Sequence, residues 1–218
     1  MQGIKPVIFR SFSPFGRAGG LAGSIGAATE KLTGRAGLWF NLKIVLFGGD
    51  NTRMTTALLA LGSNLGDREA MLRGARAALH TSPGLRVTAS SGLYETEPVG
   101  GPAGQSPYLN AVLQVETALD PHGLLERCLA VEKHFGRVRE AAWGPRTLDV
   151  DLLFWGRGIR HEPDLELPHP RLHLRPFVLI PLAELIPDFI HPLSGRTIRD
   201  LADSLQPAKG VSRLCQSW

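Results

Sequence analysis

Apolar and polar residues follow regular patterns from residue 54 onward, and these patterns predict a domain that mixes strands and helices. The apolar run Thr56–Leu61 is typical of a buried strand. Apolar residues then recur at helical spacing behind Asp67, which predicts a helix with Asp67 as its N-cap. Further strands are expected over Leu85–Leu93, which is rich in Val, Thr and Ser, and over Tyr108–Glu116, where apolar and polar residues alternate.

The second half of the chain continues the pattern. A helix is expected from Pro121 to Gly136, and a strand follows around Asp149. Two more helices are expected over Phe177–Leu185 and Thr197–Leu205. The order strand, helix, strand, strand, helix, strand is that of the split βαβ unit. We therefore expect an α+β, ferredoxin-like sandwich with an antiparallel sheet and extra C-terminal helices.

Residues 1–53 differ from the rest of the chain in composition and in the pattern of apolar residues. They are rich in Gly, Ser and Arg, show no sustained period, and carry seven basic and two acidic side chains, a net +5 that leaves the remainder at −1. We interpret them as an extension outside the domain, either disordered or preceding the natural start at Met54; an organellar transit peptide is the alternative. The domain is then expected over residues 54–207, with residues 208–218 as a C-terminal tail.

Composition narrows the class of protein. At 218 residues with 20% charged residues, the chain is long enough to bury a sizeable core. Its apolar runs are shorter than the roughly 20 residues that span a bilayer. Cys128 and Cys215 lie too far apart in sequence to indicate a zinc site or a disulfide framework, so we expect a cytoplasmic protein without a membrane partner. The net charge of the body also argues against a nucleic-acid partner.

The segment Trp143–Phe154 carries the most informative chemistry. Asp149 and Asp151 lie two residues apart in an apolar run, so in a strand they share a face and lie about 6–7 Å apart. Two carboxylates at that spacing can bind one divalent ion or bracket a pair, as in phosphoryl-transfer sites. The alternative is a strand with two ordinary aspartates on a solvated face.

Basic residues flank these aspartates. Arg137, Arg139 and Arg146 supply fixed positive charge, which is what polyphosphate chemistry needs beside metal-binding carboxylates. A second basic cluster, His169, Arg171, His173 and Arg175, lies in a Pro-rich loop further on. The chain contains neither a P-loop nor the dinucleotide-binding glycine fingerprint. Surface arginines without a function are the alternative for each residue taken singly.

Six groups of residues together resemble the 6-hydroxymethyl-7,8-dihydropterin pyrophosphokinases of folate biosynthesis. In chain order they are Gly62-Ser63-Asn64-Leu65-Gly66-Asp67, Tyr94-Glu95-Thr96-Glu97-Pro98-Val99-Gly100, Tyr108-Leu109-Asn110-Ala111, Gly136-Arg137-Val138-Arg139, Trp143–Phe154, and Pro168-His169-Pro170-Arg171 with Arg175-Pro176-Phe177-Val178. The resemblance covers roughly residues 57–205. The resemblance is specific because the motifs occur in the same order and at the same spacing as in the family. The fold that it implies is again ferredoxin-like.

The resemblance implies transfer of pyrophosphate from ATP to the pterin hydroxymethyl group, with release of AMP. It implies that Asp149 and Asp151 bind two Mg²⁺ ions and that Arg137 and Arg146 clamp the phosphates. ATP contacts are implied for Glu132, Arg139, His169 and Arg175. A pterin pocket is implied for Thr96, Val99, Tyr108, Asn110, Trp143 and Phe177. Ring stacking suits Trp143 and Phe177, and the amide of Asn110 can both donate and accept hydrogen bonds; the alternative for Phe177 is a plain core residue.

One departure and two alternatives accompany this interpretation. Ala142 stands where the family usually carries a basic or charged residue, which predicts an altered affinity for ATP. An RNA-binding module of the same fold would need a basic body and aromatic residues on the sheet face. A non-catalytic pterin or nucleotide binder remains the alternative function. A monomer is expected, as is catalysis by positioning and charge neutralisation, because no strong general base stands out.

Overall fold

The protein is described here by a computed structural model, which defines residues 54–98, 102–137, 144–208 and 210–218. Residues 1–53 lie outside the described residues. The elements are β1 Thr55–Ser63, α1 Arg68–His80, β2 Leu85–Ser90, β3 Leu93–Thr96, β4 Tyr108–Thr117, α2 Pro121–His134, β5 Asp149–Trp155, β6 Arg160–His161, β7 Glu166–Leu167, the 3₁₀ turn η1 Leu172–Leu174, α3 Pro176–Leu185, α4 Ile198–Asp203 and β8 Val211–Cys215. The described helices include none that is long and apolar enough to cross a membrane.

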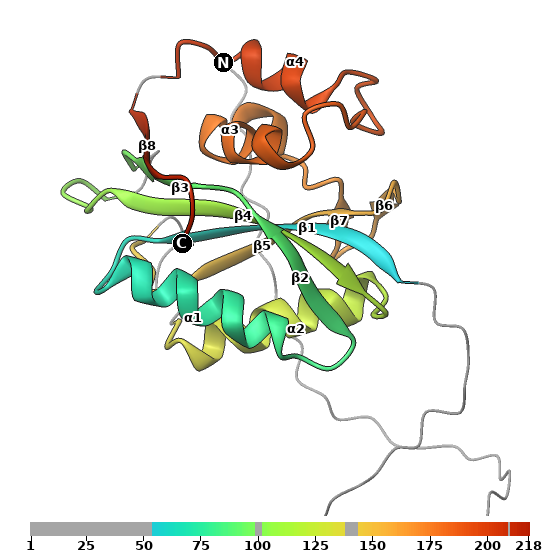
Figure 1. Cartoon of the computed structure of the whole chain (residues 1–218), viewed down its shortest axis with the longest axis horizontal. Coiled ribbons are helices and arrows are strands. Elements are labelled where there is room, and N and C mark those ends of the chain that lie inside the picture. The colour runs from blue at the N-terminus through green and yellow to red at the C-terminus, as the bar shows by residue number, and fades with distance from the viewer. Residues whose placement is uncertain (1–53, 99–101, 138–143, 209) are drawn as a thin grey trace, which may run out of the picture. The chain divides into compact units, whose positions relative to one another are not determined.

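An antiparallel sheet forms the centre of the domain. Its strands lie in the order β5-β1-β4-β3-β8, and β2 also pairs with β4. Helices α1 and α2 cover one face, and α3 and α4 cover the opposite face (Figure 1). The α+β class and the antiparallel sheet expected from the sequence are confirmed.

Each face of the sheet buries its own apolar core because strand residues alternate sides. On β4, Leu109, Ala111, Leu113 and Val115 belong to the core shared with α1 and α2, as the alternation in the sequence predicts. Val112 belongs to the second core, which also contains the α3 residues Val178, Leu179 and Leu182. The helix starts also follow the sequence: the side chain of Asp67 accepts a hydrogen bond from the backbone N–H of Ala70, at 3.0 Å.

The expected strand Leu85–Leu93 is in fact interrupted, and this is a correction. Strands β2 and β3 both pair with β4, but Ser91 and Gly92 lie between them. The backbone N–H of Val112 donates to the hydroxyl of Ser91, at 2.9 Å, in addition to the Ser91 N–H donating to the Val112 carbonyl. The hydroxyl of Ser91 thereby accepts the hydrogen bond from β4 that a backbone carbonyl accepts in a regular ladder. The strand is interrupted at this point and continues as β3.

The C-terminal end differs from the expected tail. Residues 208–218 include the strand β8, which pairs with the outer edge of β3. The final residue, Trp218, is only 7% exposed and belongs to the core beneath α1 and α2. Apolar and polar residues do not alternate over Val211–Cys215, which is why the sequence alone does not indicate a strand there.

Candidate active site

The residues singled out from the sequence meet on the sheet face that carries α3. Val112 and Leu153 pack in the α3 core, so Asn110 and Asp151, each two residues earlier on the same strand, face that side as well. The strand register completes the arrangement. Gly62, near the end of β1, pairs with Asn110 on one side and with Asp149 on the other. The expected pterin residues and the expected metal ligands therefore flank one strand.

Gly62 keeps the space between these two groups open. A Cβ atom at this position would lie 3.0 Å from the side-chain oxygen of Asn110 and 4.0 Å from the Cβ of Asp149. A larger side chain would push into the polar groups on both sides. The contacts around Gly62 thus explain why a glycine occupies this position of β1.

Both aspartates of β5 point to this face, as the sequence predicts. Their neighbours Val150 and Leu152 are buried in the opposite core. Asp149 carries two arginines: Nη1 of Arg137 lies 2.5 Å from one carboxylate oxygen, and Nη1 of Arg146 lies 2.5 Å from the other. All three side chains are largely buried, so these ion pairs are poorly screened by water.

Glu132, at the end of α2, supports this cluster from behind. Its carboxylate is buried and forms an ion pair with Arg137. The same oxygen accepts a hydrogen bond from the backbone N–H of Val150, at 2.8 Å. Glu132 therefore fixes Arg137 to the strand that carries the two aspartates.

Asp151 contacts a second basic pair from the loop before α3. Nη1 of Arg175 lies 3.4 Å from its carboxylate, and Nε2 of His169 lies 3.9 Å away. Burial, followed by the negative charge of Asp149, raises the pKa of Asp151 to about 6. Burial together with the charges of Arg175 and Arg171 lowers the pKa of His169 to about 4, which leaves its imidazole neutral at pH 7.

The expected pterin residues lie on the other side of Gly62. The side-chain amide of Asn110 donates to the hydroxyl of Thr96, at 2.7 Å, and both side chains are buried. The Tyr108 hydroxyl donates to the carbonyl of Gly144, at 3.4 Å, which connects β4 to the segment before the aspartates. Phe177, the second residue of α3, is partly buried against the second core, and the guanidinium of Arg175 lies 5.7 Å from its ring centre.

Three of the expected site residues, Val99, Arg139 and Trp143, lie outside the described residues, as does Ala142. Most of the others lie on the two sides of Gly62: the residues assigned to metal and phosphate on the side of β5, and Thr96, Tyr108 and Asn110 on the side of β4. Their roles toward ligands remain predictions.

Asn64 is a residue of this region that the sequence reasoning did not assign. Its side-chain oxygen accepts from the backbone N–H of Arg146, at 2.7 Å, and its backbone N–H donates to the Arg146 carbonyl. Its amide nitrogen donates to the side chain of Gln105 and to the carbonyl of Ser106, at 3.2 and 3.3 Å. The signal was present, because Asn64 lies inside the Gly-Ser-Asn-Leu-Gly motif that contributes to the family resemblance, but a loop amide alone indicates no partner.

Within the described parts of the chain, another group has suitable atoms for a metal ion: His122, Glu162 and Asp164. It lies at the start of α2, away from the aspartate pair, and its side chains are substantially exposed. The positive end of a helix dipole disfavours a cation there. The carboxylates of β5, surrounded by basic residues, are the better candidates for phosphate chemistry.

Comparisons with known proteins indicate the family. Residues 58–187 match the model of the 7,8-dihydro-6-hydroxymethylpterin-pyrophosphokinase family. The chain is 46% identical over 161 residues, 74% of its length, to the 2-amino-4-hydroxy-6-hydroxymethyldihydropteridine pyrophosphokinase of Methylorubrum extorquens, covering 99% of that protein. It is 47% identical over 129 residues, 59% of its length, to the enzyme of the same name from Bacillus subtilis, covering 77% of it.

Solved structures share the fold. The Plasmodium falciparum HPPK-DHPS with pteroate superposes on 74% of this chain with a TM-score of 0.58 at 14% sequence identity. A crystal structure of HPPK-DHPS in complex with substrates gives a TM-score of 0.57 at 15% identity over 74% of this chain. The chain spans about half the length of those two proteins, 48% and 46%.

Proposed function

The chain belongs to the 7,8-dihydro-6-hydroxymethylpterin-pyrophosphokinase family, which transfers pyrophosphate from ATP to the hydroxymethyl pterin in folate biosynthesis, and we propose that Asp149 and Asp151 bind the Mg²⁺ ions for this transfer. The fold is accordingly ferredoxin-like. One observation carries the proposal: two neighbouring carboxylates on β5 are surrounded by Arg137, Arg146 and Arg175 on the face that also holds Asn110.

The donor set fits two divalent cations. Asp149 and Asp151 share one face of the strand, and burial, followed by the negative charge of Asp149, raises the pKa of Asp151. A hard cation favours such carboxylate oxygens and relieves this repulsion. Bound Mg²⁺ supplies positive charge that neutralises the polyphosphate oxygens as negative charge shifts to the leaving group.

The arginines on Asp149 provide the phosphate clamp. Arg137 and Arg146 each contact one carboxylate oxygen of Asp149, so a cation held by Asp149 would compete with these guanidinium groups for the carboxylate. A released guanidinium has five N–H donors suited to phosphate oxygens. Glu132, in addition to the ATP contact expected from the sequence, keeps Arg137 close to the transferred group through their ion pair.

We assign the remaining basic residues to ATP. Arg175 and the neutral imidazole of His169 lie beside Asp151, where they offer hydrogen bonds to phosphate or ribose oxygens. Arg139 belongs to the same group by its sequence position. Together these residues hold the nucleotide so that its β-phosphorus lies near the attacking hydroxyl, which is positional catalysis.

The pterin binds on the other side of Gly62. Asn110 and Thr96, already hydrogen-bonded to each other, present fixed donors and acceptors to the heterocycle edge. Phe177 and Tyr108 contribute aromatic surface, with Trp143 and Val99 assigned by sequence position. The hydroxymethyl group then faces the phosphates, and its hydroxyl attacks the β-phosphorus while AMP leaves.

We also propose that the enzyme works as a cytoplasmic monomer on small-molecule substrates. The two cysteines, Cys128 and Cys215, are free, which suits a reducing compartment. The structural relatives that carry a second enzyme are longer chains, of which this chain covers 46% and 48%.

The test is an AMP-release assay with ATP, Mg²⁺ and 6-hydroxymethyl-7,8-dihydropterin, comparing the wild type with Asp151→Asn. We expect pterin-dependent AMP formation in the wild type and a loss of about a hundredfold or more in the variant. Asp188→Asn, which alters a mostly exposed carboxylate at the other end of α3, is the matched control and should retain activity. Equal activity of Asp151→Asn would contradict the metal assignment, whereas tight binding of both substrates without AMP would support the non-catalytic alternative.

A further inference from the structure

The C-terminal segment is anchored at its last residue. The indole Nε1 of Trp218 donates to the carbonyl of Ser91, at 2.8 Å, and the ring lies under the guanidinium of Arg76, 5.2 Å from its centre. Arg76 also donates to the Trp218 backbone. The indole is buried in the core, so this anchor combines apolar burial with a satisfied indole N–H.

A second anchor joins β8 to β3 and α3. Glu184 forms an ion pair with Arg213 of β8, at 2.8 Å. The same carboxylate accepts from the hydroxyl of Tyr94, at 2.6 Å, and from the backbone N–H of Gly92, at 2.7 Å. The close approach of the two strands needs the glycine: a Cβ at Gly92 would lie 2.5 Å from the Cys215 carbonyl oxygen.

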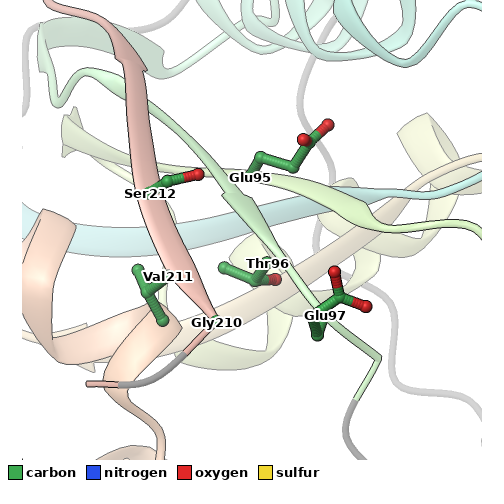
Figure 2. A pocket seen from close by; sticks show the side chains of 6 residues that line it. All are labelled: Glu95, Thr96, Glu97, Gly210, Val211 and Ser212. Carbon is green, nitrogen blue, oxygen red and sulfur yellow. The ribbon is translucent and has the colours of Figure 1, made fainter. Parts of the chain in front are cut away.

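The opposite end of β8 reaches the expected pterin pocket. Val211 pairs with Thr96, and the carbonyl of Gly210 accepts from the N–H of Glu97, at 3.1 Å. Glu95, Thr96, Glu97, Gly210, Val211 and Ser212 line a surface hollow where the two strands end (Figure 2). Thr96, which receives the hydrogen bond of Asn110, is part of this lining. One wall of the hollow is therefore made by the C-terminal strand.

We infer that β8, held by Trp218 and Arg213, is a positioning element for the pterin pocket. The strand β3 has only four residues, and its ladder with β4 covers one edge; β8 supplies hydrogen bonds to the other edge. Fixing the backbone around Thr96 in advance lowers the entropy lost when the pterin binds. This inference rests on the proposed function, since it takes Thr96 as a pterin contact.

The effect is confined to one substrate. In the sheet order, β8 and β5 lie at opposite ends, so the aspartates and arginines of the phosphate site are separated from β8 by three strands. Loosening β8 should therefore weaken pterin binding and leave ATP binding and the chemical step unchanged.

The experiment compares the full chain with Trp218→Ala, Trp218→Phe and Arg213→Ala in steady-state kinetics for each substrate. We expect Trp218→Ala and Arg213→Ala to raise KM for the pterin about fivefold or more, with KM for ATP and kcat within about twofold of the wild type. Trp218→Phe keeps an aromatic ring under Arg76 and should restore most of the affinity. Arg86→Ala is the matched control, because it removes another strand arginine paired with a glutamate, at 2.6 Å, at the end of β4 opposite to the one that pairs with β3.

A structural readout accompanies the kinetics. Cys215 lies within β8 and is partly buried, so its alkylation by iodoacetamide reports detachment of the strand; Cys128 is fully buried, and burial raises the pKa of its thiol. We expect faster Cys215 labelling in Trp218→Ala and Arg213→Ala.

Three results would overturn the inference: faster labelling with unchanged pterin KM, equal rises in both KM values, or unchanged labelling in both variants. If Trp218→Ala does not fold, Arg213→Ala decides alone, because its side chain is 43% exposed. A wild type that forms no AMP would instead contradict the proposed function.

Discussion

At the scale of single residues, Asn64 connects the two segments that enclose the site. It bonds the backbone of Arg146 on one side and residues Gln105 and Ser106 on the other. We expect Asn64→Ala to lower kcat/KM for both substrates by about tenfold to a hundredfold, since it removes the acceptor of the Arg146 N–H and the donor to the Ser106 carbonyl, and losing such a partner costs about 1–3 kcal/mol. Steady-state kinetics with each substrate varied in turn measures this.

Asn64→Asp separates the hydrogen bond that Asn64 accepts from Arg146 from the one that it donates to Ser106. The carboxylate can still accept from the Arg146 N–H but cannot donate to the carbonyl of Ser106, which it repels. We expect this variant to affect the pterin KM more than the ATP KM. Equal kinetics for Asn64→Ala and wild type would show that the amide has no part in positioning Arg146.

Tyr94 gives the protein a defined sensitivity to alkaline pH. Burial, followed by its hydrogen bond to the Glu184 carboxylate, raises the pKa of Tyr94 well above its ordinary value of 10.0. The unfolded chain loses this proton above about pH 10 while the folded protein retains it, so the free energy of unfolding falls as pH rises through that value. Denaturant unfolding across this range should show the decline, and Tyr94→Phe should flatten it. Since Tyr108, the other tyrosine of the chain, is also shifted upward, some slope will remain.

At the scale of elements, the sequence predicted best where a local rule decides the outcome. Asp67 caps α1 because a cap depends only on neighbouring backbone groups, and Asp149 and Asp151 share a face because strand alternation is geometric. The break at Ser91 and the strand β8 depend on a partner distant in sequence. The position of Asn64 between two loops could not be predicted for the same reason.

The capping box of α4 gives an element-level prediction. The Thr197 hydroxyl accepts from the N–H of Asp200, at 3.1 Å, and the Asp200 carboxylate accepts in return from the N–H of Thr197. We expect Thr197→Ala to lower the free energy of unfolding by about 1 kcal/mol, or the Tm by about 2–4 °C, with no change in kcat. Thr197→Ser keeps the oxygen and serves as the control; a loss of activity at unchanged Tm would contradict the purely structural role of α4.

At the scale of the whole molecule, the described cores and site residues all lie from residue 54 onward. The first core residue is Ala57, and the family match begins at residue 58. We therefore predict that a chain starting at Met54 keeps the Tm, kcat and both KM values of the full chain. Calorimetry and AMP release on the two forms, side by side, measure this. A lower Tm would show that residues 1–53 stabilise the domain, and a changed ATP KM at low salt alone would assign their +5 charge to nucleotide attraction.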